Sequence, residues 1–264
     1  MTPSGSDQRP PALSGPRFAP LVAGALYPGL ERGVVADAFA TRALGGRALL
    51  VCTSLVVAGH GRVTDVLDVP ADTVQAQVEH LFATLRPTGA CVGLAGSAAS
   101  ASALVETLGA RLEGPLVFNL TLSGPSGEDV ADGRVREVLV RAFPLADVVV
   151  VGRHDAELVA GIEVATLDDA QVAVQRLHRQ GARAVVLRCG SLPARDFASQ
   201  SESFATDLLY DGEAFTLYEA PVIERPDLEG ASSAFVLALL KARLGGLSLE
   251  ESVRLAKHFV TEAL

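Results

Sequence analysis

The chain has 264 residues and a formal net charge of −9 at pH 7, a balance that argues against nucleic acid or an anionic membrane surface as its partner. Hydrophobic residues make up 49% of the sequence and aromatic residues only 5%, so a sizeable core must be built from Ala, Val and Leu. No apolar run has the uncharged length of a membrane-spanning helix.

The N-terminal segment is rich in Pro, Ser and Gly and lacks the continuous apolar stretch of a signal peptide. Residues 1–16 are therefore predicted to be a disordered tail. One domain over residues 17–264 is predicted to follow, because no linker or internal repeat interrupts the rest. The three cysteines lie in or beside apolar runs without CxxC spacing. This usage favours buried thiols in a reducing compartment, so we expect a cytoplasmic protein.

From residue 18 onward, short apolar runs alternate with amphipathic stretches. The apolar runs predict strands at 18–24, 47–57, 90–94, 115–120, 146–152 and 183–189. The amphipathic stretches predict helices at 31–44, 71–85, 97–111, 130–142, 154–160, 168–179, 231–243 and 248–262. Strands separated by helices are typical of βαβ units. The sequence therefore predicts a three-layer α/β/α fold with a mostly parallel central sheet and helices on both faces.

The pattern changes after residue 195, where residues 204–219 predict an antiparallel hairpin that turns at Asp211–Gly212. Ligands of open α/β sheets lie beyond the carboxyl ends of the strands. A binding site is therefore expected among the loops after residues 24, 57, 94, 120, 152 and 189, together with the turn at 227–231.

The turn at 227–231 runs directly into a helix of small residues. Free backbone N–H groups of Gly230, Ala231 and Ser232 at a helix start, together with the helix dipole, could bind a phosphate without a charged side chain. The alternative is an ordinary helix start, where Gly or Ser serves only as a cap. The residues alone leave both interpretations open.

Three other polar residues stand at or near predicted strand ends. Asp155 could orient Mg²⁺ or its water near nucleotide phosphates, or it could cap its own helix. Arg188 could pair with a phosphate through its guanidinium group, or it could be a surface cation. Asn119 can hydrogen-bond a ligand but cannot act as a base.

The first predicted strand and helix carry a motif. Residues 21–57 resemble the signature A-G-x-D-P-x-G-G-x-G-x-x-A-D of hydroxymethylpyrimidine and phosphomethylpyrimidine kinases, within the ribokinase-like superfamily. The matching positions are Ala23, Gly24, Pro28, Gly29, Gly33, Ala36 and Asp37. The later segments VVVVGRHDAELVAG, AVVLRCGSL, DLLYDGEAFTLYEAPVI and PDLEGASSAFVLAL resemble further motifs of that family in the same order. The likeness covers roughly residues 18–264.

The resemblance implies a ribokinase-like fold, use of ATP and Mg²⁺, a homodimer, and phosphoryl transfer to a small hydroxymethyl heterocycle, as in thiamine biosynthesis. By the same resemblance, substrate contacts fall at Gly24, Leu26, Ala58, Gly59 and Asn119. Anion or nucleotide contacts fall at Gly230, Ala231, Ser232, Arg188 and Asp155, and Asp155 is also the candidate Mg²⁺ ligand. The expected pocket is bordered by Gly24, Asn119, Arg188 and Gly230.

Several positions depart from the family pattern. Leu26 stands in the region of a substrate-contacting acid, and small residues replace a polar pair after the second strand. Ala231 occupies the place of the Cys or Asp that takes the proton from the acceptor hydroxyl. Asp227 and Glu229 are candidate substitutes, although Glu229 would repel a triphosphate. We therefore expect transfer to hydroxymethylpyrimidine to be very slow or absent.

Two functions of different class follow. The first is an ATP-dependent kinase of a small hydroxymethyl heterocycle. The alternative is a catalytically inactive relative that binds a nucleotide or small metabolite, or serves as a structural or regulatory partner. The fold by itself does not decide between them.

Overall fold

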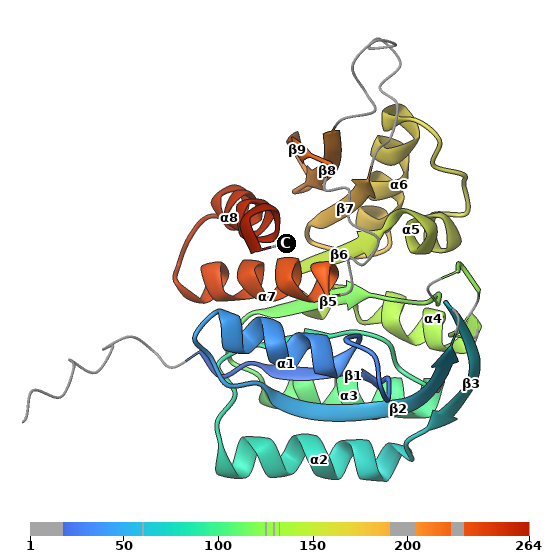
Figure 1. Cartoon of the computed structure of the whole chain (residues 1–264), viewed down its shortest axis with the longest axis vertical. Helices are drawn as coiled ribbons and strands as arrows, with labels where there is room; N and C mark the ends of the chain where they lie inside the picture. Colours follow the sequence, from blue (N-terminus) through green and yellow to red (C-terminus); the bar gives the residue numbers. More distant parts are fainter. Residues whose placement is uncertain are drawn as a thin grey trace, which may run out of the picture.

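The computed structural model describes residues 18–59, 61–124, 126–128, 130–131, 133–190, 204–222 and 230–263. The predicted tail at 1–16 and the candidate bases Asp227 and Glu229 lie outside these residues. Within the described ranges the middle layer is a nine-stranded sheet of order β3-β2-β1-β4-β5-β6-β7-β8-β9 (Figure 1). No helix in these ranges combines the length and hydropathy that a bilayer crossing requires.

The central strands of the sheet are parallel and its edges are antiparallel. Strands β2, β1, β4, β5, β6 and β7 pair in parallel, whereas β3, β8 and β9 each pair antiparallel to their neighbours. The bounds are β1 Leu21–Leu26, β2 Leu49–Gly59, β3 Arg62–Asp68, β4 Ala90–Val92, β5 Leu116–Leu120, β6 Val148–Gly152, β7 Val185–Gly190, β8 Phe204–Tyr210 and β9 Phe215–Pro221. The predicted mostly parallel sheet and C-terminal hairpin are both confirmed.

Helices cover both faces of the sheet (Figure 1). Helices α1, α7 and α8 pack on one face, and α2 to α6 pack on the other. The bounds are α1 Val34–Ala43, α2 Ala71–Thr84, α3 Ala98–Arg111, α4 Gly133–Arg141, a short 3₁₀ helix η1 Phe143–Leu145, α5 Arg153–Ala160, α6 Leu167–Arg179, α7 Ala231–Leu244 and α8 Leu249–Ala263. The three-layer prediction is therefore confirmed.

Strand β6 illustrates why these apolar runs become central strands. Successive side chains of a strand point to opposite faces of the sheet. Val149 and Val151 belong to the core under α2 to α6, and Val148 and Val150 belong to the core under α7 and α8. A continuous run of valines is thus buried on both faces, as expected for a parallel strand between two helical layers.

Helix α7 is buried on most of its circumference. Residues 235–240 are all fully buried, because α7 packs against the sheet and is also contacted by α1 and α8. A helix that is apolar on nearly every side can lie only in such an interior position. This burial fixes where the N-terminus of α7 lies relative to the carboxyl ends of the strands.

Strand β3 was not predicted from the sequence. It pairs with the extended end of β2, and most of its residues are exposed at the edge of the sheet. The register shifts at Val57 and Ala58, so that Thr64 is an extra residue in β3. The bulge lets Val63 and Val66, three positions apart, pack in the same small apolar cluster with Tyr27. It thereby breaks the alternation that would have indicated a strand.

Helix α8 is attached to the hairpin through a buried ion pair. The Nζ of Lys257 lies 2.9 Å from Oδ2 of Asp207 on β8, and it also donates to the carbonyl of Ala205 at 2.9 Å. Asp207 is only 3% exposed. A buried carboxylate that loses its nearest cation keeps the cost of desolvation and loses most of the attraction that offsets it, since the Nε of Arg188 lies farther away, at 4.0 Å from Oδ1.

We predict that Lys257→Met lowers the free energy of unfolding by about 3 kcal/mol, because it leaves the Asp207 carboxylate buried without its ammonium partner. Lys241→Met is the matched control, since the Nζ of Lys241 is exposed and donates only to the carbonyl of Leu44. The control should cost less than about 1 kcal/mol. Urea unfolding of the two variants measures the difference, and equal losses would contradict the assignment.

Candidate active site

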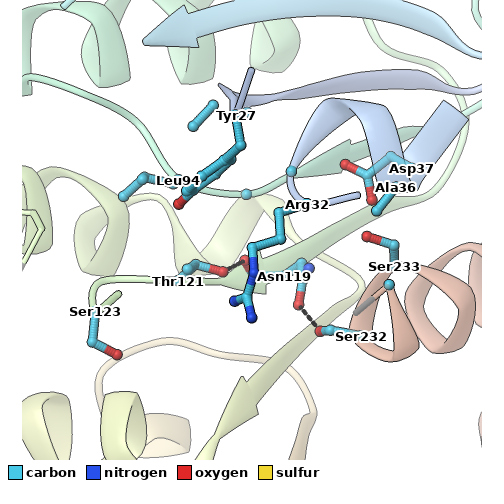
Figure 2. Close-up of a pocket in the computed structure, with 15 residues that line it drawn as sticks. Tyr27, Arg32, Ala36, Asp37, Leu94, Asn119, Thr121, Ser123, Ser232 and Ser233 are labelled. Atoms are coloured by element: carbon cyan, nitrogen blue, oxygen red, sulfur yellow. Dashed lines mark hydrogen bonds between the residues drawn. The ribbon is translucent and has the colours of Figure 1, made fainter. Parts of the chain in front are cut away.

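A cavity of about 210 Å³ lies at the carboxyl ends of β1, β4 and β5, beside the start of α7 (Figure 2). The strand order reverses at β1, which has β2 on one side and β4 on the other. Such a switch point is where open α/β sheets bind ligands. The lining residues are Gly24, Ala25, Tyr27, Arg32, Gly33, Ala36, Asp37, Gly93, Leu94, Asn119, Thr121, Ser123, Gly230, Ser232 and Ser233.

One wall of the cavity is the turn between β1 and α1. Gly33 ends this turn with φ 56°, and a Cβ there would lie 2.1 Å from the carbonyl oxygen of Ala25. Only glycine permits this close approach of the two backbone segments. The turn directs Arg32 into the cavity, toward Asn119 and Thr121 (Figure 2), and the helix that follows brings in Asp37.

The opposite wall is the N-terminus of α7. Gly230 holds the N-cap position with φ 82°, and no side chain of the described residues caps the helix there. The first intrahelical bond runs from the N–H of Ala234 to the carbonyl of Gly230. The N–H groups that precede it at the start of α7 are therefore free of helical acceptors, and they form a site of partial positive charge that suits an anion.

Asn119 connects the end of β5 to α7. Its Oδ1 accepts a hydrogen bond of 2.9 Å from the hydroxyl of Ser232, and its carbonyl accepts one of 3.1 Å from the hydroxyl of Thr121 (Figure 2). The bond from Ser232 orients the side-chain amide at the floor of the cavity, and the bond from Thr121 holds the backbone beside it. Asn119 and Ser232 thus lie together in the lining of one cavity.

Asp37 is the carboxylate of the cavity. It is 6% exposed, and its Oδ1 has no hydrogen-bond partner among the described residues. Burial raises the pKa of this carboxyl from 3.8 to about 7, while a hydrogen bond with the Ser233 side chain acts in the opposite direction. Figure 2 shows the Ser233 hydroxyl on α7 facing the carboxyl group across the gap between the two helices.

The structure brings together only part of the predicted site. Gly24, Asn119, Gly230 and Ser232 line the cavity. The other described candidates lie outside its lining, namely Leu26, Ala58, Gly59, Asp155, Arg188 and Ala231. Leu26 is the last residue of β1, and Ala58 lies near the end of β2. Ala58 packs in the apolar cluster around Tyr27.

Arg188 at the end of β7 is held beside α7 rather than in the cavity. Its guanidinium carbon lies 5.2 Å from the centroid of the Phe235 ring, and its Nε is 4.0 Å from Oδ1 of Asp207. That Nε is buried without a hydrogen-bond partner among the described residues. The ring and the carboxylate therefore hold the Arg188 side chain in place without any contact with a ligand.

Asp155 lies behind the cavity at the start of α5. It is 8% exposed, and its Oδ1 accepts a hydrogen bond of 2.6 Å from the hydroxyl of Ser123, which lines the cavity. Burial raises the pKa of this carboxyl, and the Ser123 hydrogen bond opposes the shift. Within the described ranges, no cluster of three or more His, Cys, Asp or Glu side chains could hold a metal ion by itself.

Sequence reasoning missed several residues of the cavity. Arg32, Thr121, Ser123 and Ser233 were not candidate ligand contacts, and their spacing in the sequence gives no sign that they meet. Asp37 was noted only as the last residue of the N-terminal motif. The useful signal was its position on the buried side of an amphipathic helix, where a carboxylate is rare unless it is paired or functional.

The strand order and the cavity at its switch point place the chain in the ribokinase-like class of α/β folds. The family model "Phosphomethylpyrimidine kinase" matches residues 31–264, and the chain belongs to this family.

Individual relatives agree with that membership. A hydroxymethylpyrimidine/phosphomethylpyrimidine kinase of Aquifex aeolicus is 26% identical over 233 residues, which cover 88% of each protein. The crystal structure of phosphomethylpyrimidine kinase from Clostridium difficile has a TM-score of 0.77 at 21% identity, covering 94% of this chain and 99% of that one. A pyridoxal kinase of Staphylococcus aureus in complex with AMP-PCP and pyridoxal has a TM-score of 0.80 at 21% identity, covering 93% and 87%. The two structures show the shared fold.

The raised pKa of Asp37 predicts a pH dependence of stability. The folded state binds this proton more tightly than the unfolded chain, so Asp37 lowers stability progressively as pH rises from about 4 to about 7. Asp37→Asn removes the effect. At about pH 8 the variant should be more stable than the wild type by up to roughly 4 kcal/mol, because one pKa unit corresponds to about 1.4 kcal/mol.

Urea unfolding of both proteins at a series of pH values measures this difference, which should vanish below about pH 4, where both side chains are neutral. Asp65→Asn controls for the change in net charge at an exposed position. A stability difference that stays constant across the whole pH range would contradict the burial-induced shift.

Proposed function

We propose that the protein transfers the γ-phosphoryl group of ATP to the hydroxymethyl group of a small heterocycle of the pyrimidine type, in thiamine biosynthesis. The observation that carries the proposal is the meeting of a buried carboxylate and an open helix N-terminus in one cavity at the switch point of the sheet. Phosphoryl transfer depends on positioning and electrostatic stabilisation, and these features supply both.

The start of α7 is the proposed cradle for the transferred group. Its free N–H groups face a cavity that also receives the guanidinium of Arg32 (Figure 2). Fixed donors and a cation stabilise the charge that develops on phosphoryl oxygens, and they need no reorganisation during the reaction. Arg188, held near the second turn of α7 by Phe235, is the second candidate cation for the nucleotide.

The acceptor alcohol is proposed to lie between the two helices and the end of β5. The side chains of Tyr27 and Leu94 offer apolar surface to a planar ring, and Asn119 and Thr121 offer polar groups. A mostly apolar cavity with a few fixed polar groups is typical of small-molecule sites. The small volume favours a single heterocycle over a larger acceptor.

ATP and Mg²⁺ belong to the proposal because the family is one of kinases and because the Staphylococcus aureus relative was solved with AMP-PCP and pyridoxal. Among the described residues, Asp155 is the proposed Mg²⁺ ligand, and it would bind the ion directly or through a water. The phosphates would then supply much of the coordination of the ion. A homodimer and a cytoplasmic location are further parts of the proposal, resting on family membership.

A second candidate function is supported by Ala231. The methyl group at the first position of α7 cannot accept a proton, although the family resemblance places the base there. On this alternative the protein binds a nucleotide or small metabolite without turnover, as a regulatory or structural relative.

A coupled ADP-release assay on the purified chain separates the two candidates, with hydroxymethylpyrimidine, its monophosphate and pyridoxal as acceptors. The proposed function predicts ADP release that depends on one of these acceptors, together with a phosphorylated product seen by mass spectrometry. A rise in melting temperature with ATP–Mg²⁺ but no turnover would instead support the non-catalytic relative, because binding to the folded state alone raises stability. An active family member run alongside validates the assay.

A further inference from the structure

A kinase of this kind needs a group that takes the proton from the acceptor hydroxyl. Ala231 offers none, and Asp227 and Glu229 lie outside the described residues. Among the described residues that line the cavity, Asp37 is the one carboxylate. It reaches the cavity from α1, whereas the position where the family resemblance places the base is the first residue of α7.

One carboxylate oxygen of Asp37, Oδ1, is buried without a hydrogen-bond partner among the described residues. A buried acceptor atom without a partner is costly, and in a native structure it points to a strained site or to a group that is still to be bound. Asp37 lines the cavity, so the cavity is the side from which a donor would approach this oxygen.

We propose that Asp37 is the general base of this chain and that its Oδ1 accepts the proton of the acceptor hydroxyl. The inference rests on the proposed kinase function and names the group that carries the step. The acceptor oxygen forms a bond to the γ-phosphorus of ATP while the bond from that phosphorus to the β,γ-bridging oxygen breaks. ADP leaves with the bridging oxygen, and Asp37 later releases the acquired proton to water.

The groups packed around Asp37 suit this role. Ser233 faces the carboxyl group from α7, Cys91 lies on β4 behind it, and Arg32 enters the same cavity from the turn. Burial, together with the charge of Asp37, raises the pKa of the Cys91 thiol well above its usual value, so the thiol stays neutral. The first turns of α7, residues 231–240, carry no charged side chain. Ser233 is therefore the neighbour whose hydrogen bond favours the ionised form of Asp37.

A base whose pKa lies near the working pH is partly ionised and still basic enough to accept a proton. Burial raises the pKa of Asp37 to about 7, which meets this condition. The rate should therefore rise with pH along an acid limb that reports the ionisation of Asp37. Loss of the Ser233 hydrogen bond should move this limb to higher pH, because that bond lowers the pKa.

The test is the pH profile of kcat/KM for the wild type, Asp37→Asn, Ser233→Ala and the control Ser252→Ala, using the acceptor that supports turnover. We expect Asp37→Asn to lower kcat by about 10²–10⁴-fold and to abolish the acid limb. The rise in melting temperature caused by ATP–Mg²⁺ should survive in this variant. Ser233→Ala should shift the limb upward, and Ser252→Ala, a buried serine of α8 that donates to Ser248, should leave it unchanged.

Each other outcome counts against the proposal. If Asp37→Asn keeps the wild-type acid limb, or loses less than about tenfold in kcat, Asp37 is not the base. If Asp37→Asn fails to fold, an unshifted limb in Ser233→Ala overturns the assignment in its place. If the wild type shows no acceptor-dependent ADP release at any pH, the proposed function fails, and the assignment of a base fails with it.

Discussion

The burial of α7 between the sheet and the helices beside it is the constraint on which the site depends. Residues 235–240 are inaccessible to solvent, so the helix cannot rotate or slide without exposing apolar surface on several sides. Its N-terminus is therefore held at the carboxyl ends of β4 and β5. The hydrogen bond from Ser232 to Asn119 completes this placement, because it ties the first turn of the helix to the strand that forms the floor of the cavity.

A second constraint acts at the turn before α1. Gly33 lies so close to the backbone of Ala25 that no larger residue fits, and the turn therefore enters α1 in one direction. That direction buries Asp37 against Ser233. Burial disfavours the ionised form of a carboxylate, and carboxylates with strongly raised pKa values are concentrated at functional sites. Burial of Asp37 is therefore the cause both of the lost stability and of the higher affinity of its carboxylate for a proton.

Much of the fold could be predicted from the sequence because its apolar runs are unambiguous. The valines of β6 and the apolar helix α7 can only be interior elements. Strand β3 could not be predicted, since its bulge at Thr64 disrupts the alternation of its side chains. At the site, Gly230 and Ser232 were predicted from a helix start, which is a local feature, whereas Gly24 and Asn119 were predicted from the family resemblance.

The remaining site residues depend on tertiary packing that local patterns do not encode. Arg188 follows a strand as a ligand contact would, but Phe235 and Asp207 hold its guanidinium outside the cavity lining. Asp37 meets Ser233 only after α1 and α7 pack side by side, although nearly two hundred residues separate them in the sequence. Loss of a base at Ala231 suggested an inert site, whereas the packing places another carboxylate in the same cavity.

In the proposed reaction, phosphoryl transfer takes place between Asp37 and the start of α7. The most direct measurement is a crystal structure of the protein with Mg²⁺, ADP, a planar fluoride mimic of the phosphoryl group and the acceptor alcohol. The alcohol oxygen should lie about 3 Å from Oδ1 of Asp37. The mimic should lie against the N–H groups that follow Gly230. An acceptor bound elsewhere, or one whose hydroxyl faces a different base with Asp37 still unpartnered, would contradict the proposed reaction.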